Sequence, residues 1–158
     1  MSNLAELIAA AAESQVGVRE NKPNGGFKIA EYQRATWLPV GAWPWCAAFV
    51  CWCVKAAVGK TKVSFPLPMT ASAWDFERWC RSVDETVKLR KPHMGDVKRG
   101  DIVVLRFSHI GIATGPPDAD GNVPTVEGNT NAAGGRLGDG VYAKERNLSV
   151  IRSRIRFQ

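Results

Sequence analysis

The sequence predicts an α+β domain in which helices come first and an antiparallel sheet follows. Up to about residue 83, apolar residues recur at helical spacing; after Gly100-Asp101, short apolar runs alternate with turn signals, as in strands. The 158 residues suit one compact domain covering residues 1–158, and they leave no room for a second domain of ordinary size. Because 45% of the residues are hydrophobic and 23% are charged, the composition excludes disordered, collagen-like and disulfide-scaffold proteins.

Four helices are expected in the first half. Asn3 and Glu6 form a capping pair at the start of the first, and the third is apolar almost all round, which predicts a buried central helix that stops at Gly59. The second is the weakest, because it follows a Pro-Asn-Gly-Gly loop. In order, the expected helices are Met1 to Gln15, Phe27 to Ala35, Cys46 to Ala57, and the stretch from Thr70 to Val83.

Five strands are expected in the second half. The first is a continuous apolar run, as in a strand covered on both faces, and Asp120-Gly121 is a strong hairpin-turn signal between the second and third. The expected strands are Ile102 to Leu105, His109 to Thr114, Val123 to Gly128, Val141 to Leu148, and Val150 to Phe157.

The first segment, Met1 to Gln15, lacks a basic start and carries two glutamates, so an amphipathic helix is favoured over a signal peptide. No run approaches the roughly 20 apolar residues that a membrane span requires. We therefore expect a soluble protein made in the cytoplasm. Three of the four cysteines fall between positions 46 and 53, at spacings on a helix that do not suit disulfides, so we expect reduced thiols.

Cys46 is the most informative of these thiols. It occupies the first turn of the buried helix, directly after the loop that contains Pro44. The free N–H groups and the helix dipole at that end stabilise a thiolate, and the same groups could hold an oxyanion. A small buried packing residue is an equally good interpretation of this cysteine.

A nucleophilic thiol needs a base, and the chain has two histidines. His93 lies in a basic loop and is expected to be a solvated surface residue, whereas His109 starts a predicted central strand. His109 is therefore the expected base, although a hydrogen-bonded core histidine remains an alternative. Glu127 and Asn129, two apart on the return strand, share a face and could both reach one imidazole.

The pairing of the two strands tests this arrangement. A symmetric hairpin loop over residues 115–122 would place His109 opposite Gly128 and turn Glu127 and Asn129 to the wrong face. A one-residue bulge or an uneven loop beside the double proline at 116–117 would correct the register. The candidate triad therefore predicts such a shift.

These residues, in this order, resemble the CHAP family of cysteine, histidine-dependent amidohydrolases and peptidases, within the papain-like and NlpC-type cell-wall hydrolases. The resemblance covers residues 44 to 131. It implies a papain-like fold, with Cys46 as nucleophile, His109 as general base and acid, Glu127 as the residue that orients the imidazole, and Asn129 as a further polar member of the site. The matching motifs are Trp45-Cys46-Ala47-Ala48-Phe49-Val50, Gly100-Asp101-Ile102-Val103, His109-Ile110-Gly111-Ile112 and Val126-Glu127-Gly128-Asn129-Thr130.

The reaction implied by this resemblance uses no metal and no other cofactor. Some members carry an Asp-rich calcium loop just before the cysteine, but residues 33–45 contain no acidic residue here, so calcium dependence is not expected. The acidic stretch from Asp118 to Asn122 lacks the downstream glutamate of a calcium loop and is better interpreted as a turn.

The resulting hypothesis is a monomeric peptidoglycan hydrolase, similar to small phage endolysins, that cleaves an amide of the stem peptide or of its link to the sugar. Such a lysin would wait in the host cytoplasm and reach the wall through a holin-like membrane pore. A secreted antibacterial effector of the same chemistry is an alternative. So is a non-catalytic basic protein (net charge +6) that binds the anionic envelope or nucleic acid; no specific nucleic acid is expected for the lysin.

Two features stay open at this level. Trp43 and Trp45 beside the nucleophile could line a substrate groove or belong to the core. The basic stretch from Lys144 to Arg156 is expected to form a solvated strand face carrying Arg152, Arg154 and Arg156, which could also attract an anionic envelope.

Overall fold

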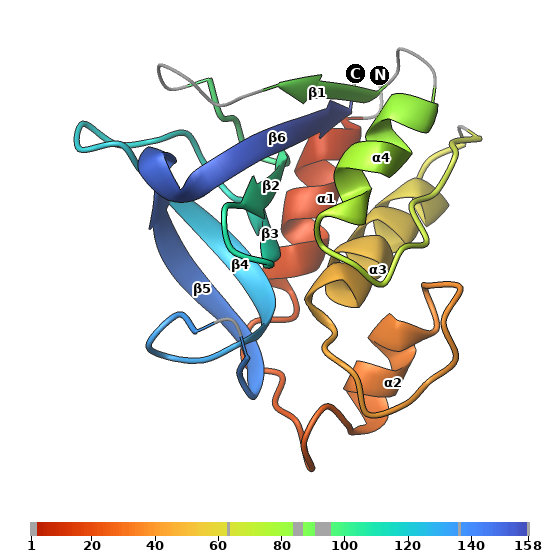
Figure 1. Cartoon of the computed structure of the whole chain (residues 1–158). Coiled ribbons are helices and arrows are strands. Elements are labelled where there is room, and N and C mark those ends of the chain that lie inside the picture. The colour runs from red at the N-terminus through yellow and green to blue at the C-terminus, as the bar shows by residue number, and fades with distance from the viewer. Residues whose placement is uncertain (1–2, 63, 84–86, 91–95, 136, 158) are drawn as a thin grey trace.

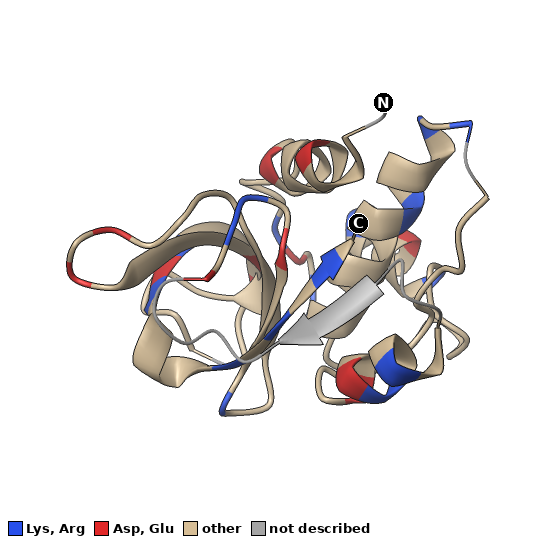
Figure 2. Cartoon of the chain, turned by 90° about the horizontal axis from the view of Figure 1, so that it is seen from above, with Lys and Arg blue, Asp and Glu red and all other residues tan. Residues whose placement is uncertain are grey.

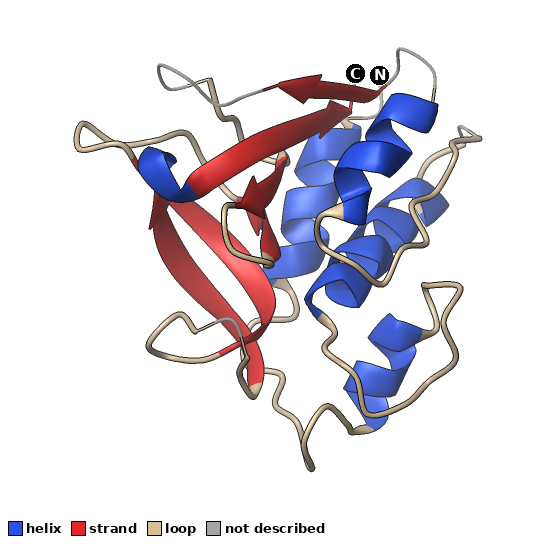
Figure 3. Ribbon diagram, viewed as in Figure 1, coloured by secondary structure: helices blue, strands red, loops and turns tan. Residues whose placement is uncertain are grey.

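The computed structural model describes residues 3–62, 64–83, 87–90, 96–135 and 137–157, and within them it has an α+β fold. Figure 1 shows the helices gathered on one side of a twisted sheet. The sheet has six strands in the order β1-β6-β2-β3-β4-β5, and every neighbouring pair is antiparallel. Figure 3 separates the two layers by colour, and the α+β prediction is confirmed.

All four predicted helices are present; three are shorter than predicted, and the third extends two residues further. At the first of them the Asn3 side chain accepts a hydrogen bond from the Glu6 backbone N–H (3.1 Å), as the capping pair predicts. The third is the most buried and includes Gly59 as its last residue. The helices are α1 (Leu4–Glu13), α2 (Phe27–Gln33), α3 (Cys46–Gly59) and α4 (Asp75–Ser82).

The five predicted strands are also present, and a sixth, β1, precedes them. This strand was not predicted from the sequence because it is only four residues long, alternates apolar and basic residues, and has no turn signal beside it. In the structure Val87 pairs with Phe157 at the edge of the sheet. The strands are β1 (Val87–Arg90), β2 (Ile102–Leu105), β3 (Ile110–Ala113), β4 (Asn122–Thr130), β5 (Gly140–Asn147) and β6 (Ile151–Phe157).

Two apolar clusters cover the two faces of this sheet. The larger one joins α1, α2, α3 and α4 to the helix-facing side chains of the central strands, among them Ile102, Ile110 and Ile112. The smaller one lies on the opposite face and contains Val103 and Leu105. Both faces of β2 are therefore buried, which explains its continuous apolar run.

The register between β3 and β4 is shifted by one residue from the symmetric pairing. Ile112 pairs with Val126 and Ala113 with Thr125. The shift that the candidate triad required is thus confirmed. The loop between these strands is an Asx turn in which Asp118 Oδ1 accepts from the N–H groups of Asp120 and Asn122 (2.9 Å each), so the turn interpretation of this acidic stretch is also confirmed.

All four cysteines are free thiols, as expected. Cys51, Cys53 and Cys80 are buried in the helical layer, and burial raises the pKa of all three, to about 11 for Cys80. They are packing residues in their reduced form.

The expectation of a solvated basic face on β6 is wrong for Arg154 and Arg156 and holds only for Arg152, which is exposed. Arg154 is 3% exposed and pairs with Asp96. Arg156 forms a bidentate pair with the buried Asp101, with hydrogen bonds of 2.7 and 2.8 Å. Arg152, the most exposed of the three, pairs with Glu77 (3.0 Å). Arg154 and Arg156 find their acidic partners in the segment that leads into the neighbouring strand β2, which the local sequence pattern does not reveal. Figure 2 shows basic and acidic segments interleaved in the view from above.

Candidate active site

Cys46 is the first residue of α3 and is largely buried, with an exposure of 7%. Cys46 lines a pocket of about 230 Å³, together with residues of the surrounding loops. The first N–H groups of a helix have no intrahelical acceptor, so they are available to an anion at this end. The lining residues are Leu38, Trp43, Pro44, Ala71, Ser72, Ala73, Ser108 and Leu137.

The segment that leads into Cys46 is held by Gln33, at the end of α2. This side chain is 1% exposed; its Nε2 donates to the carbonyl oxygens of Gly41 (2.8 Å) and Trp43 (3.2 Å), and its Oε1 accepts from the Gly41 N–H (3.4 Å). An irregular loop with two prolines and a glycine needs such external bonds, because its own backbone groups make few. Gln33 thereby fixes the approach of the chain to the nucleophile.

His109 lies directly before β3, at the close of the short link from β2, and is completely buried. The Leu105 N–H donates to the His109 carbonyl oxygen (3.0 Å), which fixes the backbone on both sides of the link. The imidazole ring lies parallel to the Phe107 ring, with centroids 5.9 Å apart. Its Nε2 is 2.9 Å from Glu127 Oε1.

Glu127, on β4, is a completely buried carboxylate surrounded by donors. Arg146 of β5 donates from Nη2 to Oε1 (2.6 Å) and from Nε to Oε2 (2.8 Å), and Thr125 Oγ1 donates to Oε2 (2.6 Å). Burial alone would raise the pKa of this carboxyl, but the bonds from Arg146 and His109 outweigh it and lower the pKa to about 2. Glu127 is therefore an anion at every pH at which the protein is expected to work.

An ionised carboxylate only accepts hydrogen bonds, so Glu127 fixes the proton of His109 on Nε2. That leaves Nδ1 for the nucleophile, and among the described residues this buried atom has no hydrogen bond of good geometry. Cys46 nevertheless interacts with the ring. Burial lowers the pKa of His109, but Cys46 and Glu127 together outweigh that effect and raise it to about 9. The imidazole is thus held between a thiol and a carboxylate.

Two glycines make room for this arrangement. A Cβ on Gly111 would lie 2.5 Å from Glu127 Cγ, so only glycine at this point of β3 lets the Glu127 side chain cross beside the strand. A Cβ on Gly128 would lie 2.7 Å from the Trp45 ring and 2.8 Å from Phe49 Cβ. Gly128 therefore lets β4 approach the start of α3 closely, which brings the glutamate near the nucleophile.

Asn129 belongs to the site but does not reach the imidazole. Its backbone is in the left-handed region (φ 56°), and the pairing of β4 with β5 is irregular between Glu127 and Thr130. With the amide oriented to satisfy both of its ends, Nδ2 donates to the Gly138 carbonyl oxygen (3.1 Å) and Oδ1 accepts from the Trp45 N–H (3.3 Å). Of the two candidates, Glu127 alone orients His109, and Asn129 holds the residue before Cys46.

The two tryptophans beside the nucleophile have different roles. Trp43 is half-buried and lines the pocket that contains Cys46, as one of the two open interpretations had it. Trp45 is completely buried, so its assignment to a substrate groove is wrong. Its indole N–H is satisfied by Glu20 Oε1 (2.8 Å) and its ring stacks on Tyr32 with centroids 5.6 Å apart, which makes it a core residue.

The sequence reasoning missed Arg146, Thr125 and Gln33. Arg146 was part of the basic stretch interpreted as solvated. The signal that could have found it is its place on β5, where it pairs with Val123 of β4, a residue on the same face of the strand as Glu127. Thr125, two residues before Glu127, shares its strand face, a relation that the period of two makes visible in the sequence. Gln33 carries no such signal. The alternative histidine, His93, lies outside the described residues.

No group of three or more His, Cys, Asp or Glu side chains suited to a metal is found in the described part of the chain. None of its helices is long and apolar enough to cross a membrane. Comparisons with protein-family models, with curated proteins and with solved structures found no match.

Proposed function

We propose that this protein is a cysteine amidase or endopeptidase of the CHAP type, with a papain-like arrangement, that hydrolyses an amide bond of peptidoglycan. The observation that carries the proposal is the Cys46–His109–Glu127 arrangement: a thiol at the start of a buried helix, beside an imidazole whose far nitrogen is bound 2.9 Å from a buried carboxylate. A nucleophile, a base and a group that orients the base are the parts that acyl transfer needs.

In the proposed reaction, the Cys46 thiolate attacks the amide carbonyl carbon, and the proton from the thiol resides on His109 Nδ1. N–H groups in the first turn of α3 stabilise the oxyanion that forms. His109 then gives its proton to the leaving nitrogen, the C–N bond breaks and the amine departs. A water molecule, deprotonated by the same nitrogen, attacks the thioester; the acid is released and Cys46 regains its starting form.

Glu127 performs the positioning in this cycle. Because it stays ionised, it stabilises the imidazolium that appears when His109 holds the proton, and it prevents the ring from turning its Nε2 toward the thiol. The preference for a wall peptide rests on the four motifs and on the pocket at Cys46. Its described lining is uncharged and mostly apolar, which suits the small neutral residues, such as alanine and glycine, that wall peptides contain.

The test is digestion of purified cell walls by the wild-type protein and by Cys46→Ala, followed by mass analysis of the soluble fragments. We expect new amino and carboxyl ends with the wild type and none with Cys46→Ala, and the fragment masses identify the bond. Cys80→Ala is the matched control, because it removes a buried thiol remote from the pocket and should keep activity. Full activity in Cys46→Ala would overturn the proposal, and binding to walls that survives it but vanishes in high salt would favour a non-catalytic binder.

His109→Ala should be as inactive as Cys46→Ala, whereas His93→Ala should retain activity. Equal damage from both histidine substitutions would show that the base is wrongly assigned.

A further inference from the structure

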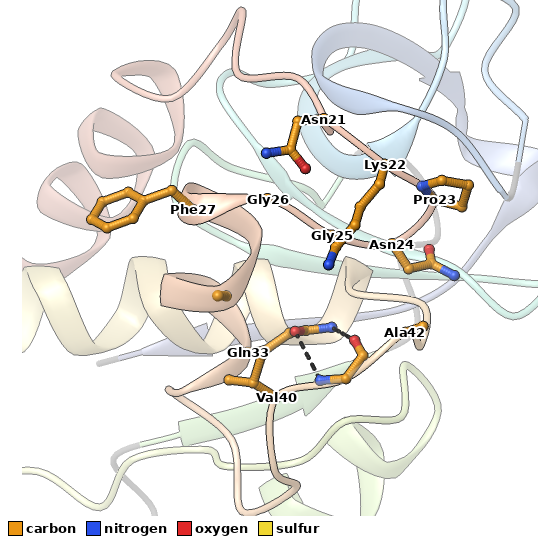
Figure 4. Close-up of a pocket in the computed structure, with 12 residues that line it drawn as sticks. Asn21, Lys22, Pro23, Asn24, Gly25, Gly26, Phe27, Gln33, Val40 and Ala42 are labelled. Carbon is orange, nitrogen blue, oxygen red and sulfur yellow. Dashed lines mark hydrogen bonds between the residues drawn. The ribbon is translucent and has the colours of Figure 1, made fainter.

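We propose that a second pocket, on the other side of the loop before Cys46, is a substrate subsite that binds a carboxylate through Lys22; this inference rests on the proposed function. The pocket has a volume of about 550 Å³ and lies between the turn at residues 21–26, the start and end of α2, and residues 40–42. Figure 4 shows the Lys22 side chain directed from the turn toward Gln33 and Val40.

The turn that presents Lys22 is closed by two backbone hydrogen bonds. The Gly25 N–H donates to the Lys22 carbonyl oxygen (2.9 Å), and the Asn21 N–H donates to that of Gly25 (3.2 Å). Pro23 and Asn24 occupy the two central positions, and Asn24 has a left-handed backbone (φ 54°), which is the residue pattern that type II turns favour. A site built on such a turn loses little freedom when a ligand binds.

Gly25 sets the position of the lysine side chain. A Cβ on Gly25 would lie 2.6 Å from Lys22 Cε and 2.7 Å from its Cγ. The aliphatic part of Lys22 thus lies flat against a residue that has no side chain, with its ammonium carried to the cavity side. Any larger residue at position 25 would displace it.

The charge in this pocket is not compensated. Lys22 is the one charged residue of the described lining, and it makes no ion pair with any described residue. The acidic residues that flank Lys22 in the sequence are engaged elsewhere, Glu31 with Lys28 (2.7 Å) and Glu20 with the Trp45 indole (2.8 Å). The rest of the wall supplies side-chain amides, backbone groups and apolar residues, of which Phe27 and Val40 are exposed. A single cation among neutral donors matches one carboxylate of a ligand.

This pocket is close to the nucleophile. Ala42 lines it and Trp43 lines the pocket of Cys46. These residues are consecutive, with Cα atoms about 3.8 Å apart, so the two pockets border the same loop. Gln33 lines the second pocket and at the same time binds the Trp43 carbonyl oxygen (3.2 Å). One substrate could therefore occupy both pockets across the loop.

The two pockets together specify a substrate class. A small uncharged residue would sit beside Cys46, and a residue with a free carboxylate would sit one or two positions away, against Lys22. Stem peptides combine such residues, because their acidic and diamino acid components keep free carboxylates. Amidation of that carboxylate should weaken binding, since a neutral amide gains little from an ammonium group.

The experiment compares a soluble muropeptide carrying free carboxylates with its amidated counterpart, using wild type, Lys22→Met, Gly25→Ala and the control Lys55→Met. Lys55 is an exposed lysine on α3, nine residues from Cys46 and outside both pockets. We expect Lys22→Met to raise KM for the acidic peptide roughly fivefold, the effect of one solvent-accessible charge pair, with kcat unchanged. Gly25→Ala keeps the charge but displaces it, and should raise KM in the same direction.

The amidated peptide should show the same KM with all four proteins. Equal KM values for wild type and Lys22→Met on the acidic peptide would overturn the subsite while leaving the proposed function intact, and so would an equal loss on both peptides. Binding can also be measured by NMR titration of the Cys46→Ala variant, which needs no turnover and therefore tests the subsite even if the wild type is inactive. Tighter binding of the acidic peptide that is lost in Lys22→Met supports the subsite. Equal binding of both peptides refutes the subsite.

Discussion

Replacing Arg146 by methionine should impair the site although Cys46, His109 and Glu127 themselves are unchanged. Methionine has a similar reach and no donor, so Glu127 would lose both of its contacts with the guanidinium, at 2.6 and 2.8 Å. Glu127 is completely buried and the Arg146 side chain is 12% exposed, so solvent cannot replace them well. His109 and Thr125 would remain as partners. Removing one member of a buried ion pair is costly because the other charge is left behind.

The magnitude follows from the pKa of Glu127. It lies at about 2 against an ordinary value of 4.5, a difference equivalent to about 3 kcal/mol of stabilisation at neutral pH, shared mainly between Arg146 and His109. We assign about 2 kcal/mol of this to Arg146, which makes two of the contacts. Because the folded-state pKa is lowered, the contribution is present above pH 4.5 and is lost as the pH falls toward 2. The substitution should therefore cost about 2 kcal/mol at pH 7 and much less at pH 2.5.

The assay is urea denaturation at both pH values for wild type, Arg146→Met, Glu127→Gln and the double variant. A coupling energy of about 2 kcal/mol at pH 7 is expected from the cycle. Arg146→Lys keeps the charge but not the planar fork, so it should restore part of the loss. In kinetics, Arg146→Met should move the acid limb of the rate profile to higher pH, because Glu127 then protonates more easily. Unfolding free energies within about 0.5 kcal/mol of wild type and an unmoved acid limb would refute this account.

The geometry of the site also predicts the effects of two more substitutions and the alkaline side of the pH profile. Glu127→Gln should lower kcat by about 10³- to 10⁴-fold, since an amide cannot accept from Arg146 at both ends and would turn its N–H₂ toward His109, favouring the wrong tautomer; an unchanged kcat would contradict this. Gly111→Ala should displace Glu127 and cost about 1–3 kcal/mol of stability, measured by urea denaturation, along with most of the activity. The rate should fall above an apparent pKa of about 9 as His109 loses its proton, and a flat profile from pH 8 to 10.5 would argue against His109 as the acid.

The local sequence pattern was enough to predict most of the helices and strands. The geometry that the candidate triad requires predicted the register shift between β3 and β4. The helices and five of the strands followed from apolar spacing and turn residues, and the shift between β3 and β4 followed from the need to bring Glu127 to His109. What failed depended on partners distant in sequence. Arg154 looked solvated because its partner Asp96 is 58 residues away, and Arg146 was overlooked because its contact with Glu127 exists only once β4 and β5 are paired. The burial of Trp45 likewise depends on Glu20 and Tyr32, which no spacing rule connects to it.

In the triplet Glu127-Gly128-Asn129, the two-residue period of a strand predicts the direction of the first side chain correctly and that of the third incorrectly. It places the first and third residues on one face, and Glu127 does bind His109 as this predicts. Asn129, however, has a positive φ at an irregularity in the strand pairing, so its side chain turns to the Trp45 N–H. Gly128, between them, admits Trp45 and Phe49 against the strand. Three consecutive residues thus tie the base on β3 and the start of the nucleophile helix to the same point of β4. This short stretch of backbone therefore helps to position His109 relative to Cys46, so a substitution at any of the three positions should lower activity.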